Sequence, residues 1–328
     1  MLQGLLTRTR DQVMAFIRSQ FDARLFPHYS LWLAMALLTG VCLVIWSRSS
    51  FDIALGEDGP GILLGIWLFC IGIRYQSRQR AMSALYFILA YLILIAPLLG
   101  AASYLAVGAG YPLIDTQLAA FDALIGFDWL AHTAWVNERA WATGLLTWTY
   151  NQLLSGMIVT LVFLLVTRRF ERVREITLLM GMTSISSIFF VTFMPAVGAY
   201  AFYNPAPELV ANIPQLAGRY HLPDFTALRD GTMSTITLSA TTGLVTFPSF
   251  HTITPVMCNW AVRGTWLFWV MLPFTIVMVI STLAIGGHYL ADVLAGLAYC
   301  VAAAGAYAHW QARREPTPAL NKPLVAGE

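Results

Sequence analysis

Two short stretches in the C-terminal third of the chain contain the residues best suited to chemistry. The stretch FPSFH ends at His251, and the stretch GGHYLAD contains His288 and Asp292. Each histidine stands at the start of a long apolar run, and at helical spacing Asp292 shares a face with His288, within reach of one ring nitrogen. Ionisable side chains are costly inside a membrane and mark functional sites there. Two histidines and one carboxylate at one membrane face therefore predict phosphoryl transfer through a phosphohistidine.

The composition is that of a membrane protein that crosses the bilayer several times. Apolar residues make up 58% of the 328 positions and charged residues only 11%, whereas soluble domains usually carry about 25% charge. There is no basic cluster with interleaved aromatic residues, so we expect no nucleic-acid partner. The cysteines fall in apolar runs without metal-ligand spacing, and we expect small buried hydrophobic residues at Cys42, Cys70, Cys258 and Cys300.

Hydropathy predicts an all-α polytopic membrane helix bundle with about eight transmembrane helices, since about 20 apolar residues are needed to cross the hydrocarbon. The expected spans are 30–47, 58–75, 81–108, 145–167, 176–200, 248–262, 265–285 and 288–310. One integral catalytic domain would thus occupy residues 30–310. A cytoplasmic segment at 1–29 would precede it, either as a helix on the membrane surface or as a polar tail. Residues 311–328 are expected to be a disordered cytoplasmic tail.

The basic residues predict the orientation. All of them except Arg48, Arg139, Arg219 and Arg229 fall in segments on the same side as the N-terminus. The positive-inside rule therefore favours two cytoplasmic termini in a plasma or inner membrane. An even number of spans also brings both histidine motifs to the outer face.

Two long segments are expected on that outer face. Residues 109–144 mix aspartate and tryptophan with apolar residues, which predicts short helices at the membrane interface. Residues 201–247 contain four prolines and lead directly into the first histidine motif. This second segment is either a connector or a loop that caps the site.

The histidine motifs resemble a known family. Pro-Ser-x-His, followed on a later helix by His-x-x-x-Asp, resembles the type 2 phosphatidic acid phosphatase superfamily. The runs ALRDG at 227–231, GLVTFPSFH at 243–251 and FDALIGFDW at 121–129 are similar to the branch that contains inositol phosphorylceramide synthase. The resemblance covers roughly residues 110–310. It implies transfer of a phospho-headgroup from a phospholipid or lipid phosphate to a lipid alcohol, with a simple lipid phosphate phosphatase of the phosphatidic acid or polyprenyl diphosphate type as the alternative.

The sequence departs from the family pattern at two phosphate-binding positions. The first motif of the family begins with lysine, yet the only lysine here is Lys322. The third motif normally begins Ser-Arg, and Ser281-Thr282 stands in its place. Another cation must then neutralise the phosphate. Arg229 is the first choice, because a guanidinium binds phosphate oxygens in bidentate geometry; Arg219 and His221 are second choices.

The expected mechanism assigns one role to each group. His288, oriented by Asp292, attacks phosphorus and forms the covalent intermediate. His251 gives a proton to the leaving alkoxide and later takes one from the incoming water or alcohol. This chemistry needs no metal ion or cofactor, and we expect neither. Nothing in the sequence predicts the oligomeric state.

Three further residues are expected to assist. Pro248 is predicted to be the first residue of a helix, so that the amides beside Ser249 point at the phosphate and the Ser249 hydroxyl adds a donor. Gly287 would let the backbone approach the phosphate closely. A proton-coupled transporter is the rival from another class. It would need more charged residues inside the spans than the sequence offers.

Overall fold

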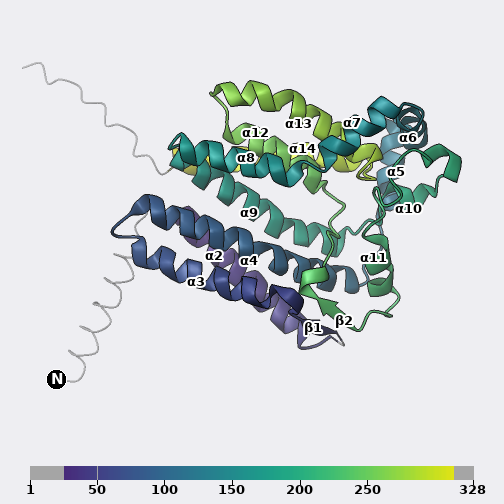
Figure 1. The fold of residues 1–328 in the computed structure, drawn as a ribbon. Coiled ribbons are helices and arrows are strands. Elements are labelled where there is room, and N and C mark those ends of the chain that lie inside the picture. Colours follow the sequence, from purple (N-terminus) through teal and green to yellow (C-terminus); the bar gives the residue numbers. More distant parts are fainter. Residues whose placement is uncertain (1–25, 50, 314–328) are drawn as a thin grey trace, which may run out of the picture.

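Long apolar helices lie side by side and form most of the molecule (Figure 1). The computed structural model describes residues 26–49 and 51–313. The long helices are α2 (Phe26–Trp46), α3 (Gly59–Tyr75), α4 (Arg80–Gly108), α7 (Ala140–Tyr150), α8 (Leu153–Val166), α9 (Phe170–Phe193), α12 (Phe250–Ala261), α13 (Trp266–Ala284) and α14 (Leu290–Ala312). The shorter elements are β1 (Asp52–Ala54), η2 (Gly56–Asp58), α5 (Asp115–Leu124), α6 (Trp129–Asn137), α10 (Ala199–Tyr203), η3 (Pro207–Val210), α11 (Leu222–Arg229), β2 (Thr235–Thr237) and η4 (Leu238–Ala240).

The expected all-α membrane bundle is confirmed. Among the described residues, α4, α9, α13, α14 and α3 together with its preceding turn are long and apolar enough to cross a membrane. Helices α7 and α8 pass the same test as a pair bent by 51°. Of the other two expected spans, the first corresponds to α2, which contains a shorter apolar stretch from Ser30 to Trp46. The span expected at 248–262 corresponds to the 12-residue helix α12, which is not among the helices that pass the test. The chain is therefore an integral membrane protein.

Some predicted boundaries were wrong. The fifth span was expected at 176–200, but α9 begins at Phe170 and ends at Phe193. Met194 cannot continue the helix easily, because Pro195 follows it and disfavours helical geometry at the residue before. Pro248 is not a first helical residue either, since Ser249 is the N-cap and α12 begins at Phe250. Cys70 is exposed on α3, whereas the other three cysteines are buried as expected.

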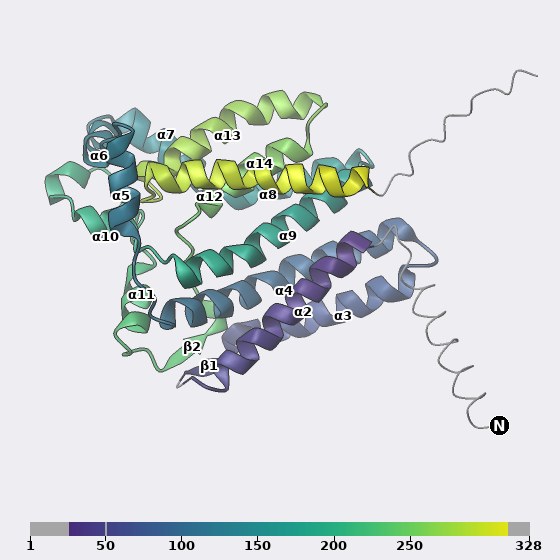
Figure 2. The same ribbon diagram turned by 180° about the vertical axis from the view of Figure 1, so that it is seen from behind.

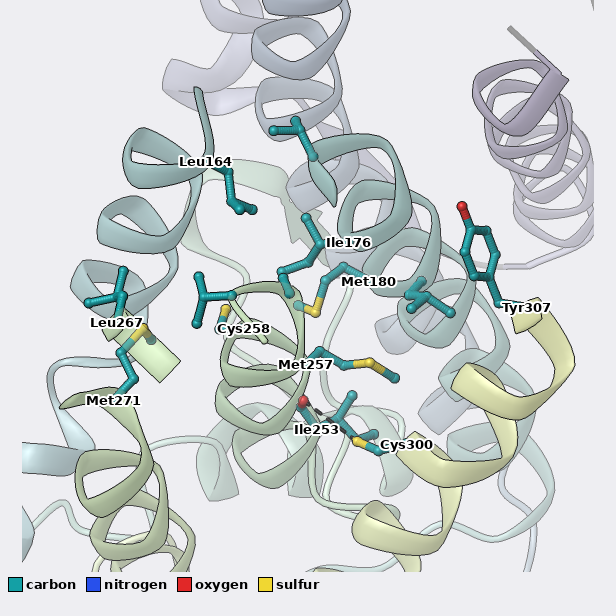
Figure 3. Packing of buried hydrophobic residues seen from close by; sticks show 14 of the residues in the cluster. Leu164, Ile176, Met180, Ile253, Met257, Cys258, Leu267, Met271, Cys300 and Tyr307 are labelled. Atoms are coloured by element: carbon teal, nitrogen blue, oxygen red, sulfur yellow. Dashed lines mark hydrogen bonds between the residues drawn. The ribbon is translucent and has the colours of Figure 1, made fainter. Parts of the chain in front are cut away.

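Helix α9 lies between two groups of helices. Figure 1 and Figure 2 show α2, α3 and α4 on one side of α9, and α8, α12, α13 and α14 on the other. The second group shares a core with α9, in which Ile176 and Met180 of α9 pack with Ile253 and Met257 of α12 (Figure 3). This packing fixes α12, the helix that begins at the first histidine motif.

The short elements gather at one end of the bundle. Figure 2 shows α5, α6, α10 and α11 at the end opposite to the start of α2 and the end of α14. The short helices expected in 109–144 are α5 and α6, and their place at the membrane interface stays a prediction. Strands β1 and β2 pair in parallel, with Asp52 opposite Thr235, so the segment before α3 is joined to the loop that leads into α12. Whether this end faces the outside stays a prediction. The proposed N-terminal surface helix lies outside the described residues, as does the tail from 314 onward.

Candidate active site

His288 and Asp292 form a buried pair at the start of α14. The Nδ1 atom of His288 lies 3.2 Å from Oδ2 of Asp292, and the same oxygen accepts the backbone N–H of Tyr289 at 3.0 Å. Asp292 is fully buried and His288 is 5% exposed. A carboxylate that accepts the Nδ1 proton leaves Nε2 with a free lone pair. The ring is thereby oriented and prepared for attack on an electrophile.

The second histidine faces the first. His251 is the second residue of α12, and its ring centroid lies 6.4 Å from that of His288. Its other face is covered by Tyr150 at the end of α7, with ring centroids 4.4 Å apart and planes at 9°. The stacking holds the His251 ring in one orientation. Tyr150 could not be identified from the sequence, because an aromatic residue at the end of an apolar helix is common in membrane proteins.

Both histidines line a cavity of about 430 Å³. Helices α4 and α9 provide an apolar wall that includes Ile93, Leu99 and Ile188. The lining also includes residues 241–246 of the segment 201–247, which we call the capping loop, together with the start of α12 and the turn before α14. Such a cavity presents reactive groups on one side and a hydrocarbon-like surface on the other, which suits an amphiphilic phosphate ester.

His221 is a third histidine at this cavity. It immediately precedes α11, is 4% exposed, and its Nε2 donates to the Val197 carbonyl at 3.0 Å. Burial lowers the pKa of His221 below its ordinary value, so the ring is neutral at pH 7. His221 is therefore suited to hydrogen bonding rather than to acting as a cation.

Two buried aspartates from α5 hold the second histidine motif in place. Asp122 accepts the backbone N–H groups of Leu290 and Ala291 at 2.8 and 2.7 Å. Asp115 accepts the Tyr289 hydroxyl at 2.9 Å and also the amides of the 197–198 loop. The Asp122 carboxylate thereby satisfies the first two backbone donors of α14, at a helix end where negative charge is stabilised. The α14 amides are consequently not available to a phosphate.

Trp129 also holds the turn before α14 in place, through hydrogen bonds of its indole. Its indole N–H is within 3.1 Å of both the Leu283 and His288 carbonyl oxygens, and the side chain is 1% exposed. Asp122 and Trp129 both belong to the run at 121–129 that carried part of the family resemblance. The structure supplies the physical reason for that run, which sequence reasoning did not find.

The two glycines before His288 are required by packing. A Cβ on Gly286 would lie 2.6 Å from the Thr282 carbonyl oxygen and 2.9 Å from the Tyr150 ring. Gly287 has a positive φ of 70°, and its added Cβ would lie 3.0 Å from Gly218 Cα. Gly286 lines the cavity but Gly287 does not. The Gly287 backbone instead meets the capping loop at Gly218.

The two arginines considered as phosphate ligands are held differently. Arg229, at the end of α11, donates to the Tyr111 carbonyl at 2.9 Å. Along the chain, Arg219 stands between Gly218 and Tyr220. Gly218 packs against Gly287, and Tyr220 lines the cavity. The Arg219 guanidinium stacks 4.3 Å above the Tyr200 ring and donates to the Gln215 carbonyl at 3.4 Å. Neither arginine is among the residues that line the cavity, but the neighbours of Arg219 do reach the site.

Ser249 is the N-cap of α12, two residues before His251. Its backbone N–H donates to the Asp292 carbonyl at 3.1 Å, which joins the starts of α12 and α14. Its hydroxyl is buried and has no hydrogen-bond partner among the described residues. The following amides, of Phe250 and His251, begin α12 and have no acceptor within their own helix. This helix start retains free donors, in contrast to that of α14.

The fold and the site together define an integral membrane protein in which two histidines and a carboxylate meet at one cavity. A family model of the PAP2 superfamily matches residues 116–306, which is more than half of the chain. The chain therefore belongs to the PAP2 superfamily. This membership supports a lipid phosphatase or phosphotransferase type of activity in general, with lipid phosphates as the substrate class. Neither the search of curated proteins nor that of solved structures returned a match.

Proposed function

We propose that the protein transfers a phosphate-bearing group of a membrane lipid through a phosphohistidine at His288. The observation that carries the proposal is the His288–Asp292 pair, with its Nδ1–Oδ2 distance of 3.2 Å, facing His251 across one cavity. Membership of the PAP2 superfamily agrees with this class of chemistry.

Each proton and bond has a place in the proposed reaction. The Nε2 lone pair of His288 attacks phosphorus, and the bond from phosphorus to the departing oxygen breaks. Protonated His251 gives its proton to that oxygen, and the lipid alcohol leaves. Neutral His251 then takes the proton of the acceptor hydroxyl, whose oxygen displaces Nε2 from phosphorus. Asp292 stabilises the imidazolium character of His288 throughout.

The phosphate is proposed to bind mainly through neutral donors. Among the described residues, none that lines the cavity is Lys or Arg. The free amides at the start of α12 form an anion-binding position beside His251. Arg219 is the proposed cationic contact, because its neighbours Gly218 and Tyr220 meet the site. Arg229 would have to break its hydrogen bond to the Tyr111 carbonyl in order to contact the phosphate.

The cavity also favours a particular kind of headgroup. Asp58, Ser103, Thr241 and Thr242 line it, from α4 and from the segments joined by the β1–β2 pair. A carboxylate among hydroxyls accepts hydrogen bonds from a polyol or an alcohol, and it repels a second phosphate. We therefore propose transfer of a phospho-headgroup to a lipid alcohol, as in inositol phosphorylceramide synthases, in preference to hydrolysis of a diphosphate.

Product analysis tests this function. Purified protein in detergent is given radiolabelled phospholipids, with and without ceramide or diacylglycerol as acceptor. We expect a new labelled phospholipid that depends on the acceptor and is absent with His288→Ala. His309→Ala, a change at the exposed far end of α14, is the matched control and should keep activity. Release of free phosphate regardless of acceptor would instead indicate a phosphatase.

A further inference from the structure

A second cavity of about 310 Å³ adjoins the first. The two cavities share Ala96, Leu99, Ser184 and Phe250 as lining residues. The second cavity runs between α4, α8, α9 and the start of α12, which are neighbours in Figure 1. It contains none of the histidines and is not used by the chemistry described above.

The lining of this second cavity is hydrocarbon-like. Leucine, isoleucine and methionine predominate, from α4, α8 and α9. The hydroxyls of Thr177 and Ser184 donate to the Val173 and Met180 carbonyls of their own helix, so they offer little to a polar ligand. Thr254 keeps a buried hydroxyl without a partner among the described residues, and Tyr91 of α4 adds one further hydroxyl to the lining. A polar headgroup would lose its hydration there without replacement.

The cavity extends from the reactive site toward the opposite end of the bundle. Along α4 its lining runs from Leu99 to Ile88, and along α9 from Ser184 to Ile176. At 1.5 Å per helical residue these stretches correspond to roughly 12–16 Å. One leaflet of a bilayer has a hydrocarbon depth of about 15 Å. The length therefore matches a lipid chain whose phosphate lies at the histidines.

The second cavity is open at one end and closed at the other. Leu154 of α8 lines it and is 62% exposed, so the cavity reaches the lipid-facing surface of the bundle. At the deep end, Ile88 and Ile176 belong to the packed core that also contains Leu164 (Figure 3). Leu161 of α8 packs against the same core. A chain entering near Leu154 would stop at these residues.

We propose that this second cavity binds one hydrocarbon chain of the lipid substrate, and that Leu161, Ile88 and Ile176 set the chain length accepted. The inference rests on the proposed function for the identity of the substrate. It adds a selection by chain length at a site separate from the reacting groups.

The first test measures chain-length preference. Lipid phosphates with a graded series of chain lengths, and chain-free p-nitrophenyl phosphate, are compared for wild type, Leu161→Trp, Leu161→Ala and Val162→Trp. Leu161→Trp should shift the optimum to shorter chains and lower kcat/KM for the longest chain about tenfold or more, at about fourfold per excluded methylene. Leu161→Ala should shift it to longer chains. Val162 is 51% exposed and does not line the cavity, so Val162→Trp should keep the wild-type profile.

The chain-free substrate separates the two proposals. If p-nitrophenyl phosphate is turned over by every variant while the chain-length profile stays unchanged in Leu161→Trp and Leu161→Ala, the chain site is refuted and the chemistry stands. If Leu161→Trp fails to fold, the opposite shift expected for Leu161→Ala still decides the matter.

The second test measures occupancy without turnover. A lipid phosphate with a diazirine at its chain end is photolysed with His288→Ala protein, and the labelled peptides are mapped. Labelling within 153–161 or 176–184, competed by excess unlabelled lipid, is expected. Labelling confined to the exposed surface of α3, around Leu63 and Trp67, would overturn the inference.

Discussion

Asp122 accepts a 2.7 Å hydrogen bond from the backbone N–H of Ala291, and through this bond the short helix α5 caps α14, the helix that carries Asp292. The same carboxylate accepts the Leu290 amide, and it is fully buried. This second hydrogen bond joins two residues that are 168 positions apart in the sequence. The position of His288 depends on α5 as much as on α14.

Removing this cap should cost both stability and activity. Asp122→Ala leaves two buried amides unpaired, which we expect to lower the free energy of unfolding by about 3 kcal/mol. Turnover should fall as well, because the turn before α14 loosens. Asp128→Ala is the matched control: it removes an exposed N-cap contact to Ala131 at 2.9 Å and should cost about 1 kcal/mol. Equal shifts in thermal unfolding for the two variants would contradict this role of Asp122.

The contribution of His251 to the rate of turnover should increase with the basicity of the leaving group. A poor leaving alkoxide needs a proton, so His251→Ala should slow lipid turnover by about 10²–10⁴-fold. With an activated phenolic leaving group, the first half-reaction should be nearly unaffected. Burst kinetics on both substrate types provide the measurement. Equal losses on the two would show that His251 does not act as the acid.

Replacing Arg219 should lower turnover more than replacing Arg229, which reverses the ranking made from the sequence. Arg219→Ala should lower turnover about a hundredfold with the fold intact, since a donor to the transition state is lost. Arg219→Lys should recover part of it, because a point charge lacks the planar fork. Arg229→Ala should keep near-normal turnover, because neither Arg229 nor its two neighbours in sequence line the cavity and Arg229 donates to the Tyr111 carbonyl. A large loss for Arg229→Ala with a small one for Arg219→Ala would reverse the assignment.

Thiol labelling tests the orientation of the bundle. Asp230→Cys, in the exposed capping loop, should react with an impermeant maleimide outside intact cells, and Glu171→Cys, at the start of α9, should not. Both are built on Cys70→Ser, because Cys70 is the exposed native thiol among the described residues. Reaction at 171 but not at 230 would place the site in the cytoplasm.

Hydropathy and motif spacing predicted most of the fold and the contact between His288 and Asp292, for identifiable reasons. Apolar runs locate membrane helices well, since the bilayer imposes their length. The His288–Asp292 spacing predicted a contact because it is local. The long-range partners were not predictable: the Asp122 cap and the Tyr150 stack join residues far apart in sequence. The ranking of Arg229 over Arg219 relied on similarity of short runs, which contains no information on what each guanidinium contacts.

The proposed reaction depends on a covalent intermediate at His288, which phosphopeptide mapping detects. Protein is mixed with radiolabelled lipid substrate, quenched in base during turnover, digested and analysed by mass spectrometry. We predict an acid-labile adduct, the phosphoryl group with its headgroup, on the peptide that contains His288, present with His309→Ala and absent with His288→Ala. A label on His251 or on any other residue, or turnover in His288→Ala protein at the wild-type rate, would contradict the account.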